Sequence, residues 1–242
     1  MELRLMAAAP PLLTHFGGAH LAALAVTVVV GAGLVWAARS RCCPRALGCA
    51  EVVLSILLIT SYPAKILARF ASGIEINIDV LFPLHLCDLA VITAFFALVF
   101  RHPLMAELTY FWGLAATLQA VLTPSTCYDF PSPAFFVYFQ MHSSVVITAL
   151  YLPLGLGWRP RPGAVLRVWR WGLVYVAVAG AVDFIAGANY GFIREKAEGS
   201  IMEILGPWPV YVFGMVALAL FAFALLDLPF AGRRAGVRDT TE

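Results

Sequence analysis

Cys87 and His142 are the two residues whose side chains could together carry out nucleophilic chemistry. A cysteine attacks as its thiolate, and a histidine can take up the thiol proton and later return it to a leaving group. Both residues lie inside apolar segments, Cys87 in P-L-H-L-C-D and His142 in F-Q-M-H. A buried cysteine can also act only as a small apolar side chain, and a histidine can hydrogen-bond two helices together. The catalytic and the structural interpretations therefore both stay open for each residue alone.

Further polar residues lie in the same kind of segment and could support the pair. A charged or strongly polar side chain inside a membrane span costs about 2.5–3.5 kcal/mol on insertion scales, so each requires a partner or a function. At about 1.5 Å per helical residue, they fall in one layer near the same ends of their segments. These residues are His85, Asp88, Gln119, Gln140 and Asp183. Structural polar residues have no reason to share one depth, and this convergence favours a site.

Each supporting residue has an expected role. Gln119 and Gln140 offer amide donors for an oxyanion, and Asp88 or Asp183 could orient the His142 imidazole. His85 and Asp88 are three residues apart and share one face of a regular helix, so we expect His85 to partner Asp88. The alternatives are paired structural aspartates and glutamines that join helices.

The elements that must position these residues are membrane-spanning helices. The chain has 242 residues, of which 62% are hydrophobic and 12% are charged, and its mean hydropathy is +0.87. Globular domains have about 45–50% apolar and about 25% charged residues, so the composition excludes a soluble enzyme. A net charge of +2 is also too balanced for nucleic-acid binding.

Charged residues and turn residues divide the chain into seven apolar blocks, each about as long as one span. We therefore predict an all-α fold, a polytopic integral membrane bundle of about seven transmembrane helices that forms a single transmembrane domain over residues 1–242. The predicted spans are residues 20–38, 46–68, 81–100, 104–123, 133–156, 167–187 and 207–228.

The distribution of basic residues predicts the orientation of the chain. With the N-terminus outside, eleven of the 16 Lys and Arg residues fall on the cytoplasmic side, many of them near residues 39–45 and 157–170. The positive-inside rule therefore places the N-terminus outside and the C-terminus in the cytoplasm.

Two features have no assigned role. Residues 74–79 alternate isoleucine with Glu75, Asn77 and Asp79, which favours a short extended segment within 70–80 or a frayed helix end. The five cysteines lack the spacing of a disulfide framework or a zinc site, and Cys127 has no obvious partner. We therefore expect no metal and no cofactor.

The stretches P-L-H-L-C-D (83–88), W-G-L-A-A-T-L-Q-A (112–120) and F-Q-M-H (139–142) carry a family resemblance. Over residues 80–145 the chain resembles the YwaF-like bacterial integral membrane proteins, which are similar to the eukaryotic transmembrane-protein-164 acyltransferases. The resemblance implies relatedness to seven-span hydrolases of fatty-acid esters that use a threonine and a histidine. In the acyltransferase branch a cysteine replaces that threonine, which matches Cys87, and the histidine matches His142.

The resemblance implies thioester chemistry in a lipid bilayer. Cys87 would attack a phospholipid acyl ester, hold the acyl group, and pass it to a lysophospholipid or to water. Phospholipid and lysophospholipid substrates and a place in the cell membrane are therefore expected, and transfer and hydrolysis both stay open. The alternative function is a small-molecule or proton-coupled transporter or receptor that uses the same polar layer as a binding site.

Overall fold

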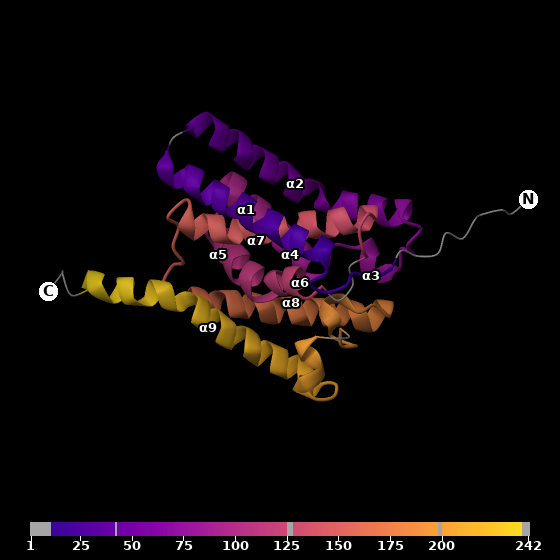
Figure 1. The fold of residues 1–242 in the computed structure, drawn as a ribbon. Coiled ribbons are helices and arrows are strands. Elements are labelled where there is room, and N and C mark those ends of the chain that lie inside the picture. The colour runs from indigo at the N-terminus through magenta and orange to yellow at the C-terminus, as the bar shows by residue number, and fades with distance from the viewer. Residues whose placement is uncertain (1–10, 42, 125–127, 198–199, 239–242) are drawn as a thin grey trace, which may run out of the picture.

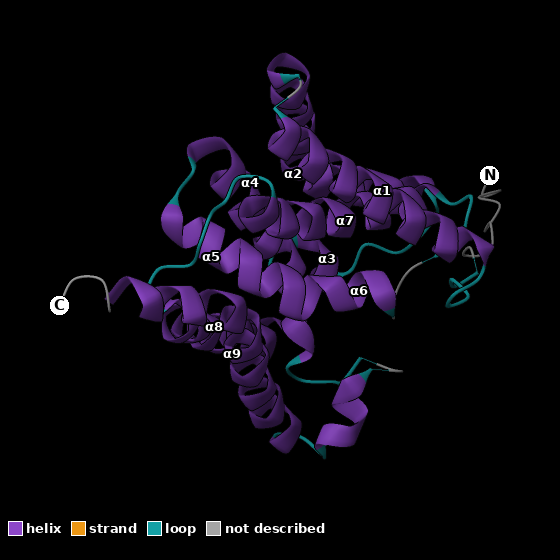
Figure 2. Cartoon of the chain, turned by 60° about the vertical axis from the view of Figure 1, so that its left-hand side comes forward, coloured by secondary structure: helices purple, strands orange, loops and turns teal. Residues whose placement is uncertain are grey.

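The regular structure is helical throughout the described residues. The computed structural model describes residues 11–41, 43–124, 128–197 and 200–238, and in these ranges no strand is formed (Figures 1 and 2). This confirms the predicted all-α fold. The longer elements are α1 (Gly18–Ser40), α2 (Pro44–Ala71), α4 (Leu86–Phe100), α5 (Pro103–Trp112), α7 (Pro133–Leu154), α8 (Ala164–Ala186) and α9 (Val210–Arg238). The shorter ones are α3 (Ile78–Leu81), η1 (Gly113–Thr117), α6 (Leu118–Leu122), η2 (Tyr190–Phe192) and η3 (Ile201–Leu205).

Six helical segments among the described residues are long and apolar enough to cross a bilayer. They are α1, α2, the α3 to α4 segment, α7, α8 and the apolar part of α9. A further helical segment runs without interruption through α5, η1 and α6 and packs beside α4 and α7. Figure 1 shows α1 beginning at one end of the bundle and α9 ending at the other, which requires an odd number of crossings. A seventh crossing through α5, η1 and α6 fits this arrangement.

The third predicted span, 81–100, is interrupted before its chemically interesting residues. Phe82 is extended (φ −119°, ψ 146°) because it precedes Pro83, and α3 therefore ends at Leu81. The next helix, α4, begins only at Leu86, with His85 as its extended N-cap residue. Pro83 thus lies in the loop that connects α3 to α4.

The alternating isoleucine segment forms no strand among the described residues. Helix α2 continues to Ala71, residues 74–77 are not helical, and α3 begins at Ile78. Ile74 is buried while Glu75 is exposed, but no neighbouring chain pairs with this stretch. Its alternation reflects one buried contact and not a β-ladder.

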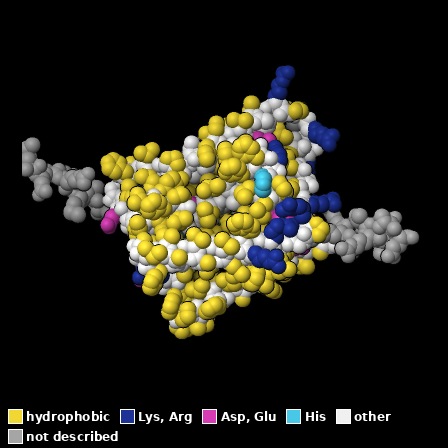
Figure 3. Space-filling model, turned by 180° about the vertical axis from the view of Figure 1, so that it is seen from behind, with side chains coloured by type: hydrophobic (Ala, Val, Ile, Leu, Met, Phe, Trp, Pro, Cys, Tyr) yellow, Lys and Arg dark blue, Asp and Glu magenta, His cyan; other side chains and the backbone are white. Residues whose placement is uncertain are grey.

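The outer surface of the bundle is largely apolar. Figure 3 shows hydrophobic side chains covering most of one face, with Lys and Arg side chains gathered mainly at one end. Phe184 and Ile185 on α8 are 90% and 84% exposed. Such large apolar surfaces are costly in water and favourable against lipid acyl chains. The surface therefore supports the assignment of a multi-pass membrane protein.

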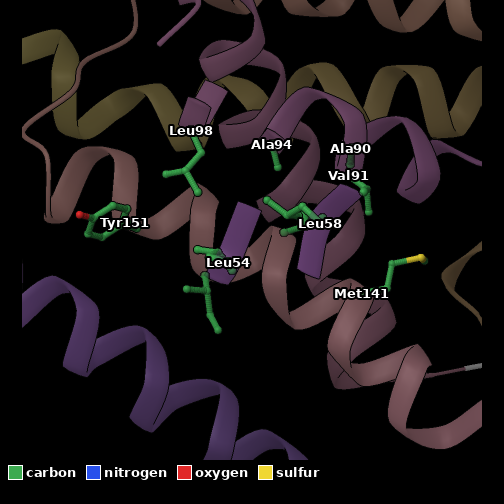
Figure 4. Close-up of a cluster of buried hydrophobic side chains, with 10 residues drawn as sticks. Leu54, Leu58, Ala90, Val91, Ala94, Leu98, Met141 and Tyr151 are labelled. Carbon is green, nitrogen blue, oxygen red and sulfur yellow. The ribbon is translucent and has the colours of Figure 1, made fainter. Parts of the chain in front are cut away.

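Helix α7 lies at the centre of the bundle and contacts α1, α2, α4 and α5. In its most apolar segment 72% of the residues are buried, whereas in α1 only His20 and Thr27 are buried. Leu58 of α2, Ala94 of α4 and Met141 of α7 meet in a cluster of buried side chains (Figure 4). Helices α8 and α9 pack on each other, and α8 contacts the rest of the bundle through α5.

Gly113 lets α7 approach the wide turn of η1 closely. A Cβ atom at Gly113 would lie 2.9 Å from the Cβ of Ala149 and 3.3 Å from a methyl group of Val145. Any larger residue would push the two helices apart. The helix ladder continues past Gly113 as a π-helical turn, a feature that occurs mostly as a single turn inside longer helices.

Candidate active site

A buried ion pair joins α2 to the first turn of α4. The ammonium group of Lys65 donates hydrogen bonds to both carboxylate oxygens of Asp88, at 2.6 and 2.8 Å. The side chain of Asp88 is 2% exposed and that of Lys65 is 19% exposed. Lys65 also lies 5.0 Å from the ring centre of Tyr62. An ion pair this deep in an apolar bundle marks the place where the fold tolerates charge.

Cys87 precedes Asp88 at the second position of α4. Its side chain is half-buried and packs against the cluster that contains Leu58, Ala90 and Met141. Asp88 and Lys65 are the charged groups that act on its thiol. The helix N-terminus has no side-chain cap, so the first N–H groups of α4 stay available to an acceptor near Cys87.

His142 lies on α7 with one ring nitrogen bonded and the other free. Its Nδ1 atom is 2.7 Å from the backbone oxygen of Tyr138. Because a carbonyl oxygen can only accept, Nδ1 carries the proton and Nε2 has the lone pair of a base. Among the described residues, the ring forms no hydrogen bond through Nε2. The ring is 4% exposed and lies beside the Tyr138 ring, with 4.2 Å between their centres.

Cys87 and His142 share their charged neighbours but are not bonded to each other. Asp88 and Lys65 act electrostatically on both side chains. Across the described part of the chain, no hydrogen bond links the Cys87 sulfur to His142. Proton transfer between Cys87 and His142 therefore requires a closer approach of the two side chains.

His85 and Asp183 hold the loop that follows α8 against the start of α4. The N–H group of Gly191 donates to Nδ1 of His85 at 3.4 Å, and the His85 ring contacts the rings of Tyr190 and Phe192. Asp183 is fully buried and accepts a hydrogen bond of 2.7 Å from the N–H group of Tyr190. Its Oδ2 atom has no partner among the described residues.

Comparison with known proteins identifies the family of this bundle. The sequence model of the TMEM164 family matches residues 15–227, which include the whole region from Lys65 to Asp183. The chain belongs to the TMEM164 family. No curated protein and no solved structure matches it.

Two partnerships predicted for the polar layer of this TMEM164-family chain are wrong. Asp88 pairs with Lys65 and not with His85, because His85 lies before the helix and does not share its regular face. The His142 imidazole is oriented by the Tyr138 carbonyl, and neither Asp88 nor Asp183 hydrogen-bonds to it among the described residues.

The two glutamines do not meet around Cys87. Gln119 is exposed and its side chain makes no hydrogen bond within the described residues, because this part of α6 lies at the periphery. Gln140 donates from Nε2 to the backbone oxygen of Leu57 at 2.9 Å and to Ser61 Oγ at 3.1 Å. Both amide hydrogens of Gln140 are therefore used to join α7 to α2.

Sequence reasoning on this TMEM164-family chain missed Lys65 and Tyr138. Lys65 lies inside the predicted span 46–68, and a lysine within an apolar block was a signal that it required a buried partner. Tyr138 contributes its backbone carbonyl to the His142 ring, and a backbone contact of this kind cannot be predicted from the residue type. Cys42 and Cys127 lie outside the described residues.

A second charged cluster lies at the opposite end of the bundle. The fully buried carboxylate of Glu107 accepts hydrogen bonds from Arg161 at 2.9 and 3.0 Å and from Arg167 at 2.7 and 3.0 Å. These bonds to Glu107 raise the pKa of the Arg161 guanidinium above its usual value. The cluster fixes the loop before α8 and is remote from Cys87.

No group of three or more His, Cys, Asp or Glu side chains among the described residues could hold a metal ion.

Proposed function

We propose that this member of the TMEM164 family is a cell-membrane enzyme that transfers or hydrolyses phospholipid acyl groups, with Cys87 as nucleophile and His142 as base. The observation that supports the proposal is the free Nε2 lone pair of His142, on a ring that shares the Lys65–Asp88 pair with the Cys87 thiol. The two helices that carry these residues, α4 and α7, pack directly on each other.

The reaction requires one proton to move twice. The Cys87 thiol gives its proton to Nε2 of His142, and the sulfur bonds to the acyl carbonyl carbon. When the tetrahedral intermediate collapses, the ester C–O bond breaks and the leaving oxygen takes the proton from His142. A lysophospholipid hydroxyl or water then attacks the thioester by the same sequence. Hydrogen bonds of this kind often tighten only in the complex with substrate, so the resting separation does not exclude the pair.

Phospholipid substrates fit the surroundings of the pair. The thiol lies within an apolar bundle whose surface faces acyl chains, and lysophospholipid acceptors enter from the same bilayer. Lipid esters lie at the boundary between headgroups and acyl chains, which a site near the N-terminus of α4 could reach.

The test uses the full chain in nanodiscs with a fluorescent phospholipid donor and a lysophospholipid acceptor. We expect acyl transfer to the acceptor or release of fatty acid, and a hydroxylamine-sensitive acyl adduct on Cys87. Cys87→Ala should abolish both. His142→Gln should slow turnover by about 100-fold or more. Cys49→Ala, which removes an exposed thiol of α2, is the matched control and should keep full activity.

Full activity of a folded Cys87→Ala variant would overturn the proposal. The transporter or receptor alternative is favoured by one observation, the buried ionic pair within the spans. It predicts saturable ligand binding or uptake without turnover, and no adduct on Cys87.

A further inference from the structure

The Tyr175 hydroxyl is a buried hydrogen-bond donor whose O–H group has no acceptor among the described residues. It lies on α8 and has no partner among the described residues. Buried polar atoms in folded proteins are nearly always hydrogen-bonded, because an unpaired one costs free energy. An unpaired donor beside a reactive side chain indicates a function.

The loop after α8 places this hydroxyl beside the start of α4. Residues 187–193 fold back on α8, and Ala188 and Tyr190 pack in a cluster that Tyr175 borders. Gly191 has φ +64°, and a Cβ atom there would lie only 2.4 Å from the Tyr175 oxygen. The N–H group of the same Gly191 reaches His85, the N-cap residue of α4.

Cys87 lies two residues beyond His85 in the first turn of α4. The Tyr175 oxygen faces the backbone N–H group of Leu86, the first residue of α4, and Cys87 is the next residue along the helix. The helix N-terminus itself has no side-chain cap. The neutral O–H donor of Tyr175 therefore lies at the same helix N-terminus as the Cys87 sulfur.

We propose that Tyr175 donates a hydrogen bond to the carbonyl oxygen of the acyl ester as Cys87 attacks it. The inference rests on the proposed function. When the C–S bond forms, the π pair of the C=O bond moves onto oxygen, and the Tyr175 hydroxyl bonds to this oxyanion without giving up its proton. When the C–O bond to glycerol breaks, the pair returns and the C=O bond of the thioester forms.

This arrangement also accounts for Gly191. Only a residue without a Cβ leaves room for the tyrosine oxygen at that point and adopts the left-handed conformation without strain. The hydroxyl is thus held by the shape of the loop and not by a competing acceptor. A donor that is positioned before charge develops is the arrangement that stabilises an oxyanion most effectively.

The experiment is Tyr175→Phe in the full chain, measured with the nanodisc assay. We expect kcat to fall about 100-fold or more with KM nearly unchanged, as for loss of one oxyanion donor. A trifluoromethyl ketone lipid analogue, whose adduct with Cys87 carries an oxyanion, should bind more weakly by a similar factor. Alkylation of Cys87 by iodoacetamide forms no oxyanion and should keep its rate. The melting temperature should not fall, because the hydroxyl has no partner to lose.

Tyr110→Phe is the matched control. The Tyr110 hydroxyl donates to the backbone oxygen of Leu226 at 3.0 Å, away from Cys87, so its removal should leave kcat unchanged.

Two outcomes would overturn the role of Tyr175. One is an unchanged kcat in Tyr175→Phe, and the other is an equal loss of acyl transfer and of iodoacetamide alkylation, which would indicate a disturbed thiol. If Cys87→Ala abolishes activity in either case, the proposed function stands without Tyr175. Activity that survives Cys87→Ala would remove both.

Discussion

Lys65 of α2 and Asp88 of α4 form a buried, two-fold hydrogen-bonded ion pair between the helices that flank the candidate site. The two residues are 23 positions apart in the sequence, and their charges act on both the thiol of Cys87 and the imidazole of His142. A buried ion pair gives little net stability, but breaking it is costly because one charge is left without compensation.

The first prediction concerns this asymmetry. Asp88→Asn should lower the free energy of unfolding by about 3–5 kcal/mol, because the Lys65 ammonium then lies buried without its counter-ion. The double variant Lys65→Met with Asp88→Leu should recover most of that loss. Thermal unfolding in detergent or nanodiscs measures both. If the double variant is as unstable as Asp88→Asn, the ion pair itself stabilises the bundle, and the loss is not caused by an uncompensated charge.

Much of the architecture could be predicted from the sequence because lipid imposes a strong constraint. Each apolar block must satisfy its backbone hydrogen bonds internally, so blocks of about 20 residues become helices. The predicted span 167–187 corresponds to α8 at Ala164–Ala186, and 133–156 to α7 at Pro133–Leu154. Pro83 lies inside the predicted span 81–100, and its effect is that α3 ends at Leu81 and α4 begins only at Leu86.

The partnerships within the site could not be predicted in the same way. Two contacts at the site join different helices, that of Lys65 with Asp88 and that of Gln140 with Ser61. The rotation and the depth of one helix against another cannot be read from the sequence. The loop after α8 brings Gly191 to Tyr175, but in the sequence it is marked only by turn residues, which do not predict this contact. Helical spacing correctly places residues within one helix, and it failed for His85 because the helix had not yet begun there.

The second prediction concerns Glu107 and its two arginines. Glu107→Gln should destabilise the protein by about 3 kcal/mol, the lower end of the range for a broken buried pair, because Arg161 and Arg167 are partly exposed and regain hydration. Because the pKa of Arg161 is raised in the folded protein, its contribution to stability is fully present below the pKa of arginine in the unfolded chain and is lost as the pH rises through the folded value. Melting curves across the neutral range should therefore show a constant difference.

Glu51→Gln is the matched control for Glu107. Glu51 pairs with Arg101, whose side chain is 48% exposed, so the ionic part of the loss should be within about 1 kcal/mol. Equal destabilisation by both variants would contradict a special contribution from the buried carboxylate.

The third prediction tests the orientation of the bundle. In a background with all cysteines replaced, a cysteine at exposed Glu75 should react with a membrane-impermeant maleimide added to intact cells. A cysteine at exposed Arg159 should react only after permeabilisation, because the positive-inside rule places this end in the cytoplasm. The reverse pattern would place the N-terminus inside and move the candidate site toward the inner leaflet.

The fourth prediction separates a structural glutamine from a catalytic one. Gln140→Leu removes two hydrogen bonds between α7 and α2. Such bonds in membrane proteins contribute about 0.6 kcal/mol each on average. The melting temperature should therefore fall slightly, while kcat stays close to that of the unaltered protein. Gln119→Leu, at an exposed position without side-chain hydrogen bonds among the described residues, should change neither quantity. A large loss of kcat in Gln140→Leu at unchanged stability would show instead that this amide reaches the reacting carbonyl. The donor role would then be shared between Gln140 and Tyr175.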